Sequence, residues 1–89
     1  MPKLYGFAYS RDALAFLKTL SAKLRRQVVT KIQALASDPF PQGHRLVQGM
    51  KDGEDRVYRI RSGDYRVLYV VRDVSVVILD IDHRKDVYR

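Results

Sequence analysis

The chain has 89 residues, a net charge of +7 and no cysteine. This length predicts one small domain over residues 1–89, and the lack of cysteine excludes disulfides and thiolate metal sites. No apolar run approaches the roughly 20 residues of a transmembrane helix, and the first residues lack a signal-peptide pattern. We therefore expect a cytoplasmic protein with no membrane association. Its charge favours a polyanion or an acidic protein as the partner, although a basic balance can also serve solubility alone.

The first part of the chain predicts one strand and two helices. Aromatic residues alternate over residues 4–9, as in a strand with one buried face. Ser10 suits the N-cap of a helix over residues 11–20, and Ser21 that of a longer helix that ends before Pro39. The apolar residues at helical spacing are Leu14, Leu17, Leu20, Leu24, Val28, Ile32 and Leu35. The basic residues Lys23, Arg25, Arg26 and Lys31 lie mainly outside that stripe and predict a solvated helix face.

The second half of the chain predicts a loop and three strands. Residues 42–55 are interrupted by three glycines and read as a loop, with Leu46 and Met50 as candidate plugs into the core. Residues 57–71 predict a β-hairpin that turns at Gly63, and residues 74–81 form a dense β-branched run that suits the centre of a sheet. The predicted fold is α+β with the order β-α-α-β-β-β, a helical hairpin packed on a small, mostly antiparallel, twisted sheet.

Arginines stand among the apolar residues of the predicted hairpin. Arg59 and Arg61 share one strand face, because successive side chains point to opposite sides. Arg66 lies beside Leu68 and Val70 on the next strand, where a partly buried charge needs a partner. That partner could be a bound anion or a carboxylate of the chain, for which Asp64 and Asp80 are the candidates. Tyr65 and Tyr69 alternate with Val67 and are predicted to be core residues.

Two motifs resemble a known family. The run Tyr58 to Tyr69, YRIRSGDYRVLY, and the tail His83 to Tyr88, HRKDVY, resemble the RelE/ParE superfamily of type II toxins, on its RelE side. The resemblance implies a ribosome-dependent mRNA endonuclease that enters the ribosomal A site, cleaves the mRNA, inhibits translation and is neutralised by a cognate antitoxin. It also implies an acidic, partly disordered antitoxin segment and a toxin–antitoxin hetero-oligomer. ParE-like relatives share the fold but inhibit DNA gyrase.

The resemblance also assigns roles to individual residues. Metal-independent cleavage, in which the ribose 2′-OH attacks the adjacent phosphate, needs proton transfer and cations that hold the phosphate charge. Arg61 and Arg66 supply such cations, and Arg84 and Tyr88 match family residues that act on the leaving group and orient a base. The family often carries lysine where this chain has arginine at 59 and 61, so we predict proton transfer by His83, because the ordinary pKa of histidine lies near neutrality. The residues predicted to bind RNA phosphates are Arg56, Arg59 and Lys85.

Other interpretations of the same residues remain open. Arg59 and Arg61 could form surface ion pairs, Arg66 could be structural, His83 could cap the sheet, and His44 reads as a surface residue. The sequence offers no metal-ligand cluster and no glycine-rich phosphate loop, so no cofactor is expected. The alternatives to the nuclease are a gyrase inhibitor that acts by binding and a nucleic-acid-binding protein without catalysis.

Overall fold

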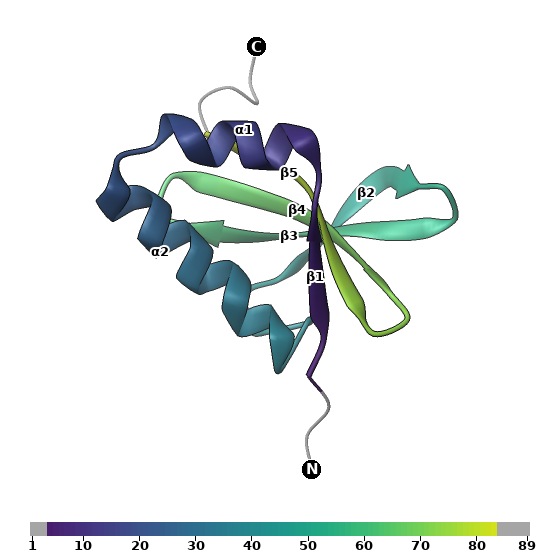
Figure 1. Cartoon of the computed structure of the whole chain (residues 1–89). Helices are drawn as coiled ribbons and strands as arrows, with labels where there is room; N and C mark the ends of the chain where they lie inside the picture. The colour runs from purple at the N-terminus through teal and green to yellow at the C-terminus, as the bar shows by residue number, and fades with distance from the viewer. Residues whose placement is uncertain (1–3, 84–89) are drawn as a thin grey trace.

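A computed structural model describes residues 4–83, which form two helices on one face of a five-stranded sheet (Figure 1). This arrangement confirms the predicted α+β class. The elements in chain order are β1 (Gly6–Tyr9), α1 (Arg11–Thr19), α2 (Ala22–Gln33), a 3₁₀ turn (Ala34–Ala36), β2 (Arg45–Asp52), β3 (Asp55–Ser62), β4 (Tyr65–Arg72) and β5 (Ser75–His83). None of the described helices is both long and apolar enough to cross a membrane.

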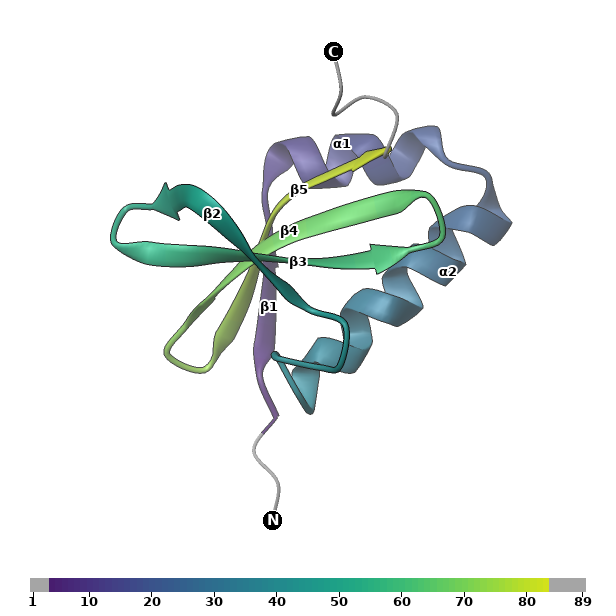
Figure 2. The same ribbon diagram turned by 180° about the vertical axis from the view of Figure 1, so that it is seen from behind.

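The sheet is mixed and strongly twisted. Its strand order is β1-β5-β4-β3-β2, with β1 parallel to β5 and every other neighbouring pair antiparallel. The helices lie behind the sheet when the molecule is seen from the back, so they leave that face uncovered (Figure 2). Strands β2 to β5 therefore have one face towards the helices and another that the helices do not cover.

Serine hydroxyls begin both helices, as predicted. The side chain of Ser10 accepts a hydrogen bond from the Ala13 N–H at 3.0 Å, and that of Ser21 accepts one from the Leu24 N–H. Arg25 is exposed, as predicted, and its guanidinium also donates to the carbonyl oxygens of Leu17 and Leu20. These carbonyls lie at the C-terminal end of α1, where α-helical donors run out, and the Leu17 carbonyl also accepts from the Leu20 N–H at 3.2 Å. The Arg25 side chain thus ties the start of α2 to the end of α1.

The core lies between the helices and the strand face that they cover. Tyr69 and Ile78 are fully buried there, and Tyr65 packs against the cluster, which confirms the prediction that Tyr65 and Tyr69 are core residues. Leu14 and Leu24 are exposed although the spacing placed them in the apolar stripe, and Ala13 is buried instead. The buried members of the cluster are Ala13, Leu17, Leu20, Val28, Ile32, Leu35, Ile60, Val67, Tyr69, Val76, Ile78 and Ile81.

The prediction of a loop over residues 42–55 is wrong, because this segment contains the edge strand β2. Leu46 and Met50 are 42% and 44% exposed, so they do not plug the core. The register of β2 against β3 shifts between Leu46 and Lys51, around Gly49, whose φ is 76°. Most side chains of β2 are exposed and its pairing is interrupted, so its sequence has no alternating apolar pattern. Only the backbone pairing with β3 identifies it as a strand.

Candidate functional site

The arginines of the central strands gather on the face that the helices leave uncovered. Arg61 of β3 stands directly opposite Arg66 of β4, and Arg66 stands opposite Asp82 of β5. In the neighbouring row, Arg45 of β2 stands opposite Arg59 of β3. Residues directly opposite in a sheet project to the same side. We call the side chains of Arg45, Arg59, Arg61 and Arg66 the arginine face.

Arg66 is neutralised by the chain itself. Its Nε lies 3.3 Å from Oδ1 of Asp82, and the two side chains are 17% and 26% exposed. The expected partners Asp64 and Asp80 were wrong, because the strand register places Asp82 opposite Arg66. The guanidinium has further N–H donors that this single contact leaves for other acceptors. Arg66 can therefore hold Asp82 and a phosphate oxygen at once.

Arg59 and Arg61 differ from Arg66 in having no internal counterion. Within residues 4–83, neither side chain forms an ion pair, and Arg61 is exposed. Like charges directly opposite in a sheet repel, and the single Asp82 carboxylate compensates only one of the two charges of Arg61 and Arg66. An external anion would relieve that repulsion, and guanidinium groups suit phosphate because they donate two parallel hydrogen bonds.

Asp80 adds a carboxyl group next to the arginine face. It stands opposite Leu68, in the row that contains Arg59, and its Oδ1 accepts a hydrogen bond from the Ile81 N–H at 2.9 Å. Burial raises the pKa of Asp80 above its usual value, and the nearby carboxylates of Asp82 and Asp12 raise it further. The sequence prediction gave Asp80 no role in proton transfer, and its burial and its place in the row of Arg59 become visible only in the fold.

His83 lies on the other face of the sheet from the arginines. It stands opposite Tyr65, and the two rings meet edge to face with centroids 5.2 Å apart. Tyr65 in turn contacts Phe16 of α1, so this cluster belongs to the helix side. The fold thus brings Arg59, Arg61 and Arg66 together and separates the ring of His83 from them by the thickness of the sheet.

The other predicted site residues lie away from the arginine face or outside the described residues. Arg56 is exposed and stands opposite Lys51 towards the tip of the β2–β3 hairpin. Strand alternation points its side chain away from the face that holds Arg59 and Arg61. Arg84, Lys85 and Tyr88 lie outside the described residues.

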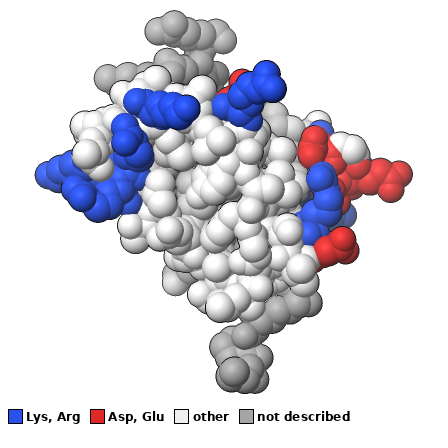
Figure 3. Space-filling model, viewed as in Figure 1, with Lys and Arg blue, Asp and Glu red and all other residues white. Residues whose placement is uncertain are grey.

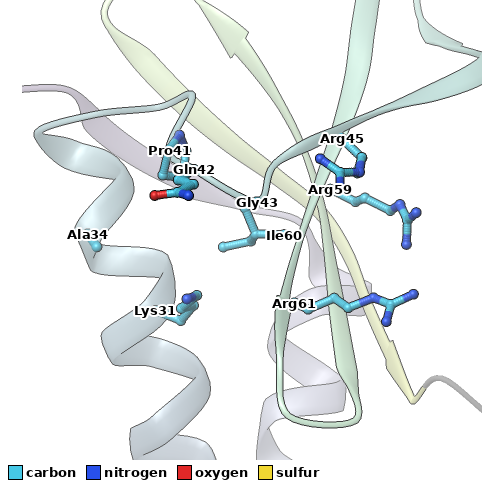
Figure 4. Close-up of a pocket in the computed structure, with 9 residues that line it drawn as sticks. All are labelled: Lys31, Ala34, Pro41, Gln42, Gly43, Arg45, Arg59, Ile60 and Arg61. Carbon is cyan, nitrogen blue, oxygen red and sulfur yellow. The ribbon is translucent and has the colours of Figure 1, made fainter.

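A groove of about 500 Å³ runs between α2 and β3, beside the arginine face. In Figure 4, Ile60 points from β3 towards α2, whereas Arg59 and Arg61 point to the other side of the strand. The groove contains no acidic residue in its lining. That lining consists of Lys31, Ala34, Pro41, Gln42, Gly43, Arg45, Arg59, Ile60 and Arg61.

His44 helps to fix the loop that closes this groove. Its Nδ1 lies 2.7 Å from the Pro41 carbonyl oxygen, and its ring packs against Phe40 and Tyr58. The buried Tyr69 hydroxyl donates to the Pro39 carbonyl at 2.6 Å. The prediction of a surface role for His44 is therefore replaced by a half-buried positioning role, which depends on contacts between distant segments.

Charge is unevenly distributed on the helix side of the molecule. Figure 3 shows lysines and arginines near the connection of α1 and α2, and acidic residues at the tip of the β2–β3 hairpin on the right. At that tip, Arg72 binds Asp52 and Asp55, each at 2.8 Å. Residues 4–83 contain no group of three or more side chains arranged to hold a metal ion.

This chain is similar in sequence and structure to toxins of toxin–antitoxin systems. Residues 7–88 match the family model described as ParE toxin of type II toxin-antitoxin system, parDE. A protein named toxin RelE1, from Methanocaldococcus jannaschii, is 33% identical over 81 residues, which cover 89% of each chain. This chain belongs to the RelE/ParE family of type II toxin–antitoxin toxins.

Solved structures agree with the family assignment. The archaeal RelE–RelB complex from Pyrococcus horikoshii OT3 contains a chain with a TM-score of 0.77 and 27% identity, and the match covers 91% of this chain and 96% of that one. The RelBE2 toxin–antitoxin complex from Mycobacterium tuberculosis gives a TM-score of 0.77 with 26% identity, over 94% of this chain and 95% of that one. Both similarities extend over the helices and the sheet together.

Proposed function

We propose that this toxin is a ribosome-dependent mRNA endonuclease that acts in the cytoplasm, cleaves mRNA in the A site and so inhibits translation. The observation that carries the proposal is the arginine face. It offers four cations from three adjacent strands on a face that the helices leave uncovered, and Arg59 and Arg61 have no counterion within the described chain. A structural role explains Arg66, which binds Asp82, better than it explains the other two.

The proposed reaction needs no metal, because RNA carries its own nucleophile. The 2′-oxygen attacks the adjacent phosphorus, the bond to the 5′-oxygen of the next nucleotide breaks, and a 2′,3′-cyclic phosphate and a 5′-hydroxyl remain. Arg61 and Arg66 would hold the extra negative charge of the phosphate as it forms, and Arg59 would bind a neighbouring phosphate. Positively charged donors aimed at that charge stabilise the transition state more than the ground state.

Proton transfer is the second requirement of this reaction. We assign it to His83, with Arg84 and Tyr88 acting on the leaving group and the base, as the family resemblance implies. Because the His83 ring lies on the helix side at the end of β5, the substrate would have to pass around that end of the sheet. The half-buried carboxyl of Asp80, whose pKa is raised by burial, is the competing candidate on the side of the arginines.

A cognate antitoxin is the proposed protein partner. The structural relatives include complexes of RelE with RelB from Pyrococcus horikoshii and Escherichia coli. A domain of charge +7 with an exposed cationic face favours an acidic, partly disordered segment that orders on binding. Such a complex would form a hetero-oligomer in which the antitoxin neutralises the toxin.

The nuclease proposal is tested with purified toxin, purified ribosomes and a defined mRNA whose codon occupies the A site. Primer extension should show a cut within that codon, and the same mRNA without ribosomes should remain intact. The mass of the upstream fragment should report the 2′,3′-cyclic phosphate at its new 3′ end. Cleavage of naked RNA would contradict the dependence on ribosomes, and an intact mRNA in both reactions would contradict the nuclease.

The match to the ParE toxin family model favours a second candidate, inhibition of DNA gyrase by binding. Gyrase supercoiling of plasmid DNA would then be inhibited at toxin concentrations that leave ribosome-bound mRNA intact. Expression would also produce DNA double-strand breaks that persist in an Arg61→Ala/Arg66→Ala variant. The nuclease proposal expects the reverse in both assays.

A further inference from the structure

We propose that the groove between α2 and β3 binds an extended acidic peptide segment, which pairs with the free edge of β3 at Arg61. This proposal deepens the proposed function and rests on it where the segment is identified with the antitoxin. The groove is lined by four cationic residues and by no acid. Its floor is the buried side chain of Ile60, so it offers charge and apolar contact together.

The edge of β3 is open at Arg61 because β2 begins too late to cover it. Arg45, the first residue of β2, stands opposite Arg59, and no residue of β2 stands opposite Ile60, Arg61 or Ser62. Just before β2, the chain turns away through Gly43, whose φ is 94°. The described part of the molecule therefore leaves the last three residues of β3 without a strand partner on this side.

The hairpin turn determines which backbone groups point into the groove. β3 and β4 are joined by the two residues Gly63 and Asp64, and Gly63 has a φ of 61°. Ser62 and Tyr65, which flank such a turn, form a hydrogen-bonded pair. Because hydrogen-bonded and non-hydrogen-bonded pairs alternate in an antiparallel ladder, Arg61 and Arg66 form a non-hydrogen-bonded pair.

Arg61 therefore turns its backbone N–H and C=O away from β4 and towards the groove. No backbone hydrogen bond from another described segment reaches these two groups. An extended peptide satisfies both groups at once, as a strand added to a sheet edge does. A nucleic-acid phosphate accepts hydrogen bonds only, so it would use the N–H and leave the carbonyl without a partner.

Strand alternation also predicts the pattern of the bound segment. A strand laid along β3 would point every second side chain towards Arg45, Arg59 and Arg61, and the others towards Ile60 and α2 (Figure 4). Carboxylates fit the first set of positions, because that side is cationic. Apolar side chains fit the second set, because Ile60, Ala34 and Pro41 line it. The preferred sequence thus alternates acidic and apolar residues.

The test uses a blocked eight-residue peptide of alternating glutamate and valine and the full-length toxin. Amide hydrogen exchange followed by NMR measures directly whether the backbone amides at the open edge of β3 are hydrogen-bonded. The Arg61 amide should exchange rapidly in the free toxin and become protected when the peptide binds, whereas the Ile60 amide should be protected in both states. An oligouridylate of equal charge is the nucleic-acid arm and should leave the Arg61 amide unprotected.

Variants separate the side chain from the backbone. Arg61→Ala should weaken peptide binding about tenfold, and Arg61→Pro, which also removes the N–H, should weaken it by about a further fivefold. Lys51→Ala, in the same hairpin but outside the groove, should bind as the wild type does. Thermal melts establish that each variant is folded, and the exchange measurement on the wild type stands if Arg61→Pro does not fold.

Three outcomes would overturn the proposal. These are protection of the Arg61 amide in the free toxin, stronger protection by the oligouridylate than by the peptide, and equal binding of a lysine–valine peptide. Each is independent of the nuclease assay, because a toxin that cuts ribosome-bound mRNA can still fail to bind the peptide. Conversely, peptide binding without mRNA cleavage would support the proposed binding groove and contradict the proposed nuclease activity.

Discussion

Adjacent rows of residues in the sheet lie on opposite faces and differ in burial and charge. The row of Tyr58, Tyr69 and Ile78 faces the helices, and its centre is fully buried. The next row along the strands carries Arg59 and Leu68 on the uncovered face. The first row stabilises the domain through burial, whereas the second holds charges that contribute little to stability. Charged side chains that are gathered on one face and unnecessary for folding mark a candidate functional surface.

Even the uncovered face is not uniform. Val57 and Val70, which lie on it by strand alternation, are fully buried, whereas the arginines occupy the other end near the Gly63 turn. Figure 2 shows that the β2–β3 and β4–β5 hairpins diverge from each other at the end of the sheet away from that turn. The difference between the two faces should therefore appear as a separation between stability and activity.

Truncation of the helix-facing row should have the largest effect. Ile78→Ala removes a fully buried side chain from the core cluster, so the free energy of unfolding should fall by about 2–5 kcal/mol. Arg61→Ala on the exposed face is the matched control and should change it by less than about 0.5 kcal/mol. Urea titrations followed by circular dichroism measure both values. Similar losses for the two variants would abolish the distinction between the faces.

Tyr69→Phe sharpens the account of the helix side. Loss of the hydroxyl leaves the Pro39 carbonyl without its donor, and we expect a cost of about 1–2 kcal/mol. Burial raises the pKa of Tyr69 well above its ordinary value, with the charges of Tyr58 and Asp38 adding to the shift. The protonated hydroxyl contributes its full stabilisation below the pKa of tyrosine in the unfolded chain, about 10. That contribution is lost as the pH rises above this value.

The measurement is the free energy of unfolding of Tyr69→Phe and the wild type from pH 8 to 11. The wild type should lose stability more steeply than the variant above about pH 10. Parallel curves would show that the Tyr69 hydroxyl titrates alike in the folded and unfolded chains, contrary to its burial.

A double-mutant cycle decides whether Arg66 serves structure or function. Arg66→Ala leaves the half-buried carboxylate of Asp82 without its partner, and we expect a cost of about 1 kcal/mol. Adding Asp82→Ala should restore much of that stability, because it removes the unpaired charge. mRNA cleavage should remain lost in the double variant. Recovery of cleavage together with stability would make Arg66 a purely structural residue.

Asp80→Asn should have the smallest effect on stability. Burial raises the pKa of Asp80 in the folded chain, so ionisation of this carboxyl opposes folding. The protonated carboxyl contributes its full stabilisation below the pKa of the unfolded chain, and this contribution is lost as the pH rises through the pKa of the folded chain. The variant should be slightly more stable than the wild type at pH 7 and equal to it at low pH. Equal stabilities across this range would contradict the raised pKa. Comparison of its mRNA cleavage with that of His83→Gln also identifies the proton-transfer residue.

Local sequence signals predicted most of the fold. Ser10 and Ser21 cap the helices as expected, and the alternation around Val67 correctly separated the core face from the arginine face. The strand β2 was missed because it is an exposed edge interrupted at Gly49, and its existence depends on pairing with β3. Arg25 was missed as a capping residue because its acceptors belong to another helix.

The site was predicted less completely, because it depends on strand register. Arg59, Arg61 and Arg66 could be placed on a common face from alternation and one turn. The partner of Arg66 could not, since the register shift between β4 and β5 at Leu68 and Tyr69 determines which aspartate stands opposite. The groove beside α2 depends equally on where β2 begins, which no local pattern indicates.

The central claim is that the arginine face acts on RNA and does not maintain the fold. The most direct measurement is the single-turnover rate of cleavage of A-site mRNA by wild-type toxin, Arg61→Ala and the helix-surface control Arg26→Ala. We predict that Arg61→Ala lowers the rate by about 10²–10³-fold, with an unchanged free energy of unfolding, while Arg26→Ala keeps most of the activity. An Arg61→Ala toxin that cleaves at the wild-type rate would contradict the account.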